Sequence, residues 1–124
     1  MRPRALLVDD DADIRAIARL SLERIGGWDV VEADGGDAAL AAAAHHGPFD
    51  AVLLDVMMPG LDGPATLAAL RAAGLPRGVP VIFLTAKAQP AERARLLGLG
   101  AAGAIAKPFD PATLPDQLQR VCAH

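Results

Sequence analysis

Aromatic residues are scarce in this chain: one tryptophan, three phenylalanines and no tyrosine make up only 3% of its 124 residues. Valine, leucine, isoleucine and much alanine must therefore fill the core, because hydrophobic residues still account for 52% of the sequence. Charged residues contribute 22%, and this balance is typical of a folded globular domain rather than of a disordered chain. The length suits a single core, so we expect residues 1–124 to form one domain.

Several other features are missing. Cys122 is the only cysteine, which excludes an internal disulfide and fits a reducing compartment. No apolar run approaches the roughly 18 to 20 residues that a membrane helix needs, and the run near the N-terminus is too short for a signal peptide. The net charge is -3, without a basic run or stripe, which argues against direct binding of nucleic acid. We therefore expect a soluble cytoplasmic protein with no membrane or nucleic-acid partner.

Short apolar runs and helically spaced segments follow one another five times along the chain. The runs predict strands at residues 5–8, 28–33, 51–54, 79–85 and 104–106. The segments after them predict helices that begin at Asp11 or Asp13, Asp37, Pro64, Pro90 and Thr113. We expect the recurring apolar residues of these helices to face the core. Short right-handed crossovers then produce a parallel sheet with helices on both faces, a single α/β sandwich.

Asp55 stands at the end of the third predicted strand. The apolar run before it lacks helical spacing and lies between turn residues, which is typical of a strand buried on both faces of a parallel sheet. Asp55 therefore marks the carboxyl end of that strand, where open α/β folds bind their ligands. A carboxylate there costs free energy unless a positive group meets it.

Polar side chains also follow other strands: Asp9 and Asp10 the first, Thr85 the fourth and Lys107 the fifth. If the first and third strands are neighbours, three carboxylates converge, and like charges so close cannot all stay ionised unaided. Oxygen ligands with spare water positions suit Mg²⁺, which would neutralise the cluster and leave one face for a phosphoryl group. An ammonium and a hydroxyl group both suit phosphate oxygens.

These residues lie in four motifs, none of them specific alone. The motifs are Leu7-Val8-Asp9-Asp10-Asp11, residues 54–63, Leu84-Thr85-Ala86 and Lys107-Pro108-Phe109. In this order and at these separations, they resemble the receiver domain of the bacterial response regulators of two-component signalling, over the whole chain. The resemblance implies a CheY-like (βα)5 fold of the flavodoxin type, a doubly wound sandwich around a five-stranded parallel sheet of order 2-1-3-4-5.

The resemblance implies roles in phosphoryl transfer. Asp55 would accept a phosphoryl group from the phosphohistidine of a sensor histidine kinase or of a phosphotransfer protein. Lys107 would pair with Asp55 and then with the phosphoryl oxygens, and a cis peptide before Pro108 would aim it inward. Thr85 would move to hydrogen-bond the phosphate. The domain would catalyse only its own phosphorylation and slow dephosphorylation, without turning over free substrates.

The resemblance also implies a metal site for Mg²⁺, with Mn²⁺ as a substitute. Asp10 would bind the ion directly and Asp9 through water. Asp55 and the backbone carbonyl of Met57 would complete the protein ligands.

The chain departs from the family pattern at several positions. Ala104 replaces the usual aromatic residue, so phosphorylation must be read out in another way. Ala102 and Gly103 replace acidic residues of the winged-helix members, which argues against that subclass. Met57 and Lys87, at positions that tune dephosphorylation, lack a carboxylate or amide to orient water, so we expect a long-lived phosphoryl group.

Other functions remain open. A haloacid-dehalogenase-like phosphatase would need a second aspartate two residues after Asp55, where Met57 stands. A flavodoxin-like FMN protein would need a phosphate-binding loop where the first acidic cluster lies. A pseudo-receiver would act by contact alone. We expect an unidentified output partner or domain, and a homodimer through the last two helices is a further hypothesis.

Overall fold

Five short apolar segments form a single parallel sheet in the computed structural model, which describes residues 2–87 and 89–122. The strands are β1 (Arg4–Val8), β2 (Asp29–Ala33), β3 (Ala51–Asp55), β4 (Val81–Thr85) and β5 (Gly103–Ala106). They pair in the order β2-β1-β3-β4-β5. The predicted α/β class, parallel sheet and strand order are thereby confirmed.

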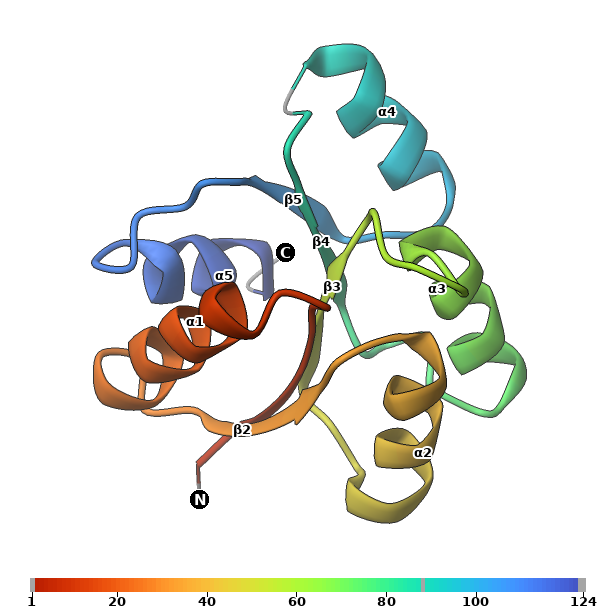
Figure 1. The fold of residues 1–124 in the computed structure, drawn as a ribbon, viewed down its shortest axis with the longest axis horizontal. Coiled ribbons are helices and arrows are strands. Elements are labelled where there is room, and N and C mark those ends of the chain that lie inside the picture. The colour runs from red at the N-terminus through yellow and green to blue at the C-terminus, as the bar shows by residue number, and fades with distance from the viewer. Residues whose placement is uncertain (1, 88, 123–124) are drawn as a thin grey trace.

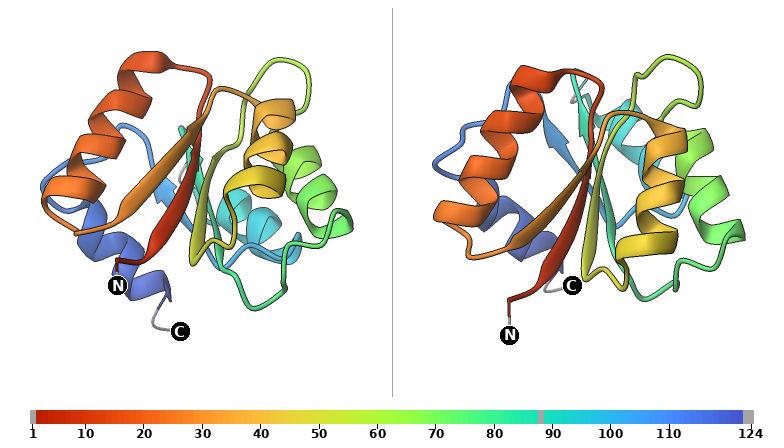
Figure 2. Two further views of the ribbon diagram at one scale, coloured as in Figure 1. Left: turned by 90° about the horizontal axis from the view of Figure 1, so that it is seen from below. Right: turned by 60° about the horizontal axis from the view of Figure 1, so that its bottom comes forward.

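Helices cover both faces of this sheet (Figure 1). They are α1 (Ala12–Arg24), α2 (Gly36–His46), α3 (Gly63–Ala72), α4 (Pro90–Gly98) and α5 (Leu114–Cys122). Helices α1 and α5 lie on one face and α2, α3 and α4 on the other, which gives three layers (Figure 2). Within the described residues, no helix is both long and apolar enough to span a membrane.

Side chains of the central strands alternate between two cores. Leu6 and Leu54 belong to the cluster that α2, α3 and α4 cover. Leu7 and Leu53 belong to the cluster beneath α1 and α5, and all four leucines are completely buried. Because successive strand side chains point to opposite faces, a strand between two helical layers requires an unbroken apolar run.

Some strand boundaries differ from the predicted ones for reasons of backbone hydrogen bonding. Strand β2 begins at Asp29 because the N–H of Trp28 donates to the carbonyl of Leu22 in α1, at 3.0 Å. Strand β4 begins at Val81, after Pro80, which has no N–H to give to the ladder. The N–H of Val79 donates within a turn, to Pro76.

The expectation that every apolar residue of the first helix faces the core is wrong. Ile17 is 47% exposed and Leu20 is 55% exposed, whereas Ala18 and Leu22 are completely buried. Helix α1 carries apolar residues on more than one stripe, and only one stripe can lie against the sheet. Its start is as predicted, since the Asp11 carboxylate caps it by accepting hydrogen bonds from the N–H groups of Asp13 and Ile14.

Candidate functional site

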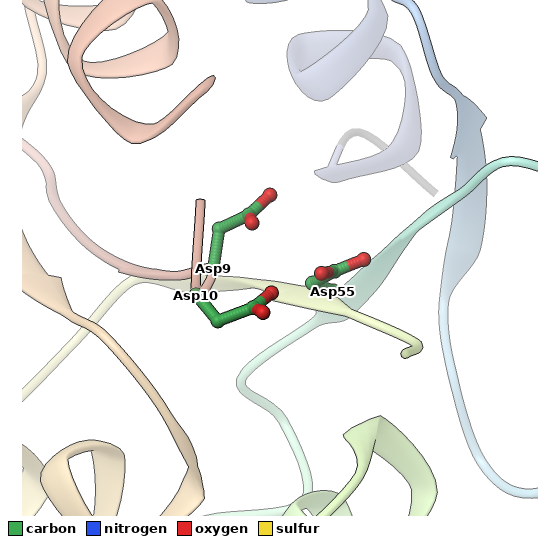
Figure 3. A group of neighbouring side chains, drawn as sticks. All are labelled: Asp9, Asp10 and Asp55. Atoms are coloured by element: carbon green, nitrogen blue, oxygen red, sulfur yellow. The ribbon is translucent and has the colours of Figure 1, made fainter. Parts of the chain in front are cut away.

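Three aspartates meet at the carboxyl ends of β1 and β3. These strands are neighbours, and their register pairs Val8 with Leu54, so Asp9 comes to lie beside Asp55. One carboxylate oxygen from each of Asp9, Asp10 and Asp55 lies within 4.8 Å of the other two (Figure 3). Asp9 and Asp55 are buried and Asp10 is exposed. The cluster occupies the point where the chain turns from one half of the sheet to the other, the usual ligand position in such folds.

Lys107 supplies the positive charge that the buried carboxylates require. It follows β5, and its ammonium Nζ lies 2.8 Å from Asp9 Oδ2 and 3.2 Å from Asp55 Oδ1. Its backbone N–H donates to the carbonyl of Thr85, at 2.8 Å. The peptide bond between Lys107 and Pro108 is cis, as expected. One cation thus bridges two of the three carboxylates and leaves an excess of negative charge.

This imbalance changes proton affinity in the cluster. Burial, followed by the charge of Asp9, raises the pKa of Asp55 from 3.8 to about 6, although Lys107 acts in the opposite direction. The pKa of Lys107 is also raised: burial lowers it, but the hydrogen bond to Asp9 and the charges of Asp9 and Asp55 outweigh that effect. Lys107 is therefore held protonated, and Asp55 is mainly ionised at neutral pH.

The cluster has the donor chemistry of a hard divalent cation site. All its donors are oxygens, they lie close together, and exposed Asp10 leaves the site open to water. Mg²⁺ prefers such a combination of few carboxylates and retained water. The residues therefore fit the ion that the sequence predicts.

Thr85 and Met57 are the other two site residues that the sequence predicts, and they differ in their surroundings. The Thr85 side chain ends β4 and is buried, and its hydroxyl accepts from the N–H of Lys87 at 3.0 Å and donates to the Lys87 carbonyl at 3.2 Å. Met57 lies in the loop after β3 with a side chain that is 76% exposed. A thioether in solvent has no acid–base function, whereas the Thr85 hydroxyl is held by its own loop.

Gly63 brings the loop after β3 close to the strand that carries Asp55. A Cβ atom at Gly63 would lie 2.4 Å from the carbonyl oxygen of Asp55 and 2.8 Å from Cα of Val56. The Gly63 N–H donates to the Val56 carbonyl at 2.8 Å, and the Asp62 carboxylate caps α3. Glycine is therefore required there for the start of α3 to lie against the backbone of Asp55 and Val56.

A hollow of about 200 Å³ lies beside Thr85, between the ends of β4 and β5 and the helices α4 and α5. Its lining residues are Thr85, Lys87, Arg93, Ala104, Ala106 and Gln117. Small side chains on β5 leave this space open. The hollow borders Ala104, which stands where the family pattern described above has an aromatic residue.

Arg15 is a site residue that the sequence reasoning missed. Its guanidinium Nη1 donates to the backbone carbonyl of Asp9 at 2.8 Å, and its Nε lies 3.0 Å from Glu32 Oε1. An arginine in the first turns of a helix carries no signal for such a contact, because the acceptor is a main-chain atom.

The five-stranded parallel sheet and the acidic cluster at the carboxyl ends of its strands are those expected of a receiver domain. Comparisons with known proteins indicate the same class. A family model described as the response regulator receiver domain matches residues 5–119. Chemotaxis protein CheY4 of Vibrio cholerae has the same fold, with a TM-score of 0.88 and 34% identity, covering 98% of this chain and 99% of that one. The chain belongs to the response regulator receiver domain family, whose members are signalling domains rather than classical enzymes.

Curated relatives are longer than this chain. The transcriptional regulatory protein PrrA of Mycobacterium tuberculosis is 41% identical over 107 residues, which are 86% of this chain and 44% of PrrA. The phosphate regulon transcriptional regulatory protein PhoB of Escherichia coli is 36% identical over 121 residues, which are 98% of this chain and 52% of PhoB. The chain therefore spans about half the length of the curated relatives it matches.

Proposed function

We propose that this domain is a Mg²⁺-dependent phospho-acceptor that takes a phosphoryl group on Asp55 from a histidine kinase or phosphotransfer protein. The observation that supports the proposal most directly is the meeting of Asp9, Asp10 and Asp55 within 4.8 Å, with Lys107 in contact with two of them. Such a cluster costs folding stability, so a fold that retains it is best explained by function.

In the proposed reaction, a carboxylate oxygen of Asp55 attacks phosphorus while the bond from phosphorus to the donor's histidine nitrogen breaks. Lys107 holds the attacking carboxylate and then pairs with the phosphoryl oxygens, and Thr85 adds a hydroxyl donor. Positioning and charge neutralisation supply most of the catalysis, because the transition state is loose and rich in negative charge. The product is an acyl phosphate.

The metal ligands in this proposal are Asp10, Asp55 and the Met57 carbonyl, with Asp9 acting through water. When bound, Mg²⁺ would neutralise the carboxylates and attract the phosphoryl oxygens. Mn²⁺ would serve in its place, since it prefers the same oxygen ligands.

The proposed output acts through a partner protein or an attached output domain. PrrA and PhoB are transcriptional regulators by name, and we propose that any DNA contact would come through such an attached domain. A homodimer through α4 and α5 and a cytoplasmic location are part of the same proposal.

Incubation with acetyl phosphate and Mg²⁺, followed by intact-mass measurement, tests the function. We expect one added phosphoryl group that hydroxylamine removes, as an acyl phosphate requires. Asp55→Asn should abolish it, whereas Asp37→Asn, at an exposed aspartate in the first turn of α2, should retain it. A wild-type domain that gains no mass would favour the pseudo-receiver that acts by contact alone.

The lifetime of the phosphoryl group is a second test. The exposed Met57 side chain has no group that could orient a hydrolytic water, so we expect slow hydrolysis of the purified phosphoprotein. Met57→Asn should shorten the lifetime, because an amide can hydrogen-bond a water. A half-life of seconds for the wild type would contradict the expectation.

A further inference from the structure

Both backbone polar groups of Asp9 are held by hydrogen bonds: its N–H, in the peptide bond after Val8, and its carbonyl, in the peptide bond that leads into Asp10. The Asp9 N–H donates to the carbonyl of Ala33 in β2, at 3.1 Å. The Asp9 carbonyl accepts from Arg15 Nη1, at 2.8 Å. The first contact continues the sheet, but the second comes from a side chain on α1. A guanidinium donor makes a stronger hydrogen bond to a carbonyl than a neutral group does.

Arg15 is itself held by a network of charges between α1 and β2. Its Nε lies 3.0 Å from one oxygen of Glu32, and Arg19 Nη1 lies 2.6 Å from the other. Arg19 also contacts Glu23, at 3.2 Å. The Arg15 side chain is only 19% exposed, so the network fixes a largely buried guanidinium. Arginine suits this position because its planar fork can donate in two directions at once.

Exposed Asp10 lacks the packing that holds Asp9. The direction of its carboxylate therefore depends on the backbone of the loop, and the Asp9 carbonyl belongs to the peptide bond that joins the two aspartates. An uncompensated change in the ψ angle of Asp9 would turn this carbonyl and redirect the Asp10 side chain relative to Asp55. The hydrogen bond from Arg15 opposes this rotation.

We propose that Arg15 is a positioning residue that orients the Asp9–Asp10 peptide and thereby sets the affinity of the carboxylate cluster for a divalent cation. This inference rests on the proposed function, because it assumes that the cluster binds the ion. Arg15 acts through the backbone and Glu32 acts through Arg15. Supporting groups of this kind typically change metal affinity by about 10–100-fold when they are removed.

An electrostatic effect of Arg15 and a positioning effect of Arg15 predict opposite changes in cation affinity when the residue is replaced. Removing a cation near an acidic site should strengthen binding of a divalent cation if charge alone matters. Removing the clamp on the Asp9 carbonyl should weaken it. The sign of the change therefore separates the two effects.

The experiment measures Mn²⁺ binding without a phosphodonor, from the electron paramagnetic resonance signal of the free ion. We expect Arg15→Gln to raise the dissociation constant by about tenfold or more. Arg19→Gln is the matched control: it removes the same charge and also loses a contact to Glu32, but Arg19 does not touch Asp9. We expect its dissociation constant to stay near the wild-type value or to fall.

Urea unfolding of both variants shows whether lost stability explains the change. A structural role alone would weaken metal binding in both variants alike, because both break the network around Glu32. If Arg15→Gln does not fold, Arg15→Lys is measured instead, with the same expected direction, since one ammonium cannot replace both contacts of the fork. An Arg15 variant that binds Mn²⁺ as tightly as Arg19→Gln overturns the inference.

Asp10→Asn, at a proposed direct ligand, separates this inference from the proposed function. If Asp10→Asn and the wild type bind Mn²⁺ equally well, the carboxylate cluster is not the ion site and the proposed function fails. If Asp10→Asn loses binding while Arg15→Gln retains it, only the role of Arg15 is overturned. A phosphorylation deficit of Arg15→Gln that disappears at saturating Mg²⁺ supports the positioning role.

Discussion

Replacing Gly63 with alanine should strain the backbone that carries Asp55, the proposed phospho-acceptor. The added Cβ would lie 2.4 Å from the carbonyl oxygen of Asp55, 2.8 Å from Cα of Val56 and 2.9 Å from Cε1 of Phe83. Two of these three neighbours are backbone atoms of the buried strand end, which cannot move aside as a flexible side chain can. Overpacking typically costs about 1–3 kcal/mol, and we expect Gly63→Ala to lie at the upper end of that range.

Urea unfolding followed by circular dichroism measures this cost, with Gly98→Ala as the matched control. Gly98 also lies in a helix, but nothing lies within 4 Å of a Cβ placed there. The control should therefore gain about 0.5–1 kcal/mol, as alanine does when it replaces glycine in an open helical position. Gly63→Ala should also accept phosphate from acetyl phosphate more slowly, because Asp55 shifts. Equal stability of Gly63→Ala and the wild type would refute the reasoning.

Three further predictions concern charge and space around the site. The hydrogen bond from Arg19 is the largest cause of the lowered pKa of Glu32. The ionised Glu32 therefore stabilises the fold above its ordinary pKa of 4.5, and this stabilisation is lost as the pH falls through the lower pKa of the folded state. The difference in unfolding free energy between the wild type and Glu32→Gln should shrink over that acidic range. Lys107→Met should raise the pKa of Asp55 further above about 6, because Lys107 lowers it now, and carbon-13 NMR of the carboxyl groups can follow this titration. Ala104→Phe should partly fill the hollow of about 200 Å³ and raise the unfolding free energy by about 0.5–2 kcal/mol, which appears as a higher urea midpoint. An unchanged or lower midpoint would show that the ring does not fill the hollow.

The sequence pattern alone predicts the parallel sheet and the polar residues at its strand ends, whereas the strand order that makes β1 and β3 neighbours is implied by the resemblance to receiver domains. Parallel strands place their carboxyl ends at one edge, so Asp9 and Asp55 meet once β1 and β3 are neighbours. Lys107 follows from the same rule. Apolar runs without helical spacing mark the strands, and turn residues mark where they end.

The wrong or missing predictions concern features that depend on tertiary contacts, which the sequence pattern does not determine. The sequence predicts Trp28 within a strand, but its N–H donates to the carbonyl of Leu22 near the end of α1. Ile17 and Leu20 have core spacing, but periodicity cannot say which apolar stripe of α1 the sheet covers. The contact of Arg15 with the Asp9 carbonyl has no sequence signature, because every residue has a carbonyl and only geometry selects this one.

If Asp55 accepts a phosphoryl group and Thr85 moves toward it, as we propose, the hydrogen bonds of Thr85 identify the backbone that this movement would free. Its hydroxyl both accepts from and donates to the backbone of Lys87, so a move toward a phosphate on Asp55 must break both bonds. Two neutral hydrogen bonds contribute about 0.5–1.5 kcal/mol each, and one bond to a charged phosphate contributes about 1.5–3 kcal/mol. The exchange is therefore nearly balanced, and a small change at Asp55 can reverse it. Lys87 also lines the hollow beside Ala104, so freeing its backbone would alter that surface without any aromatic side chain.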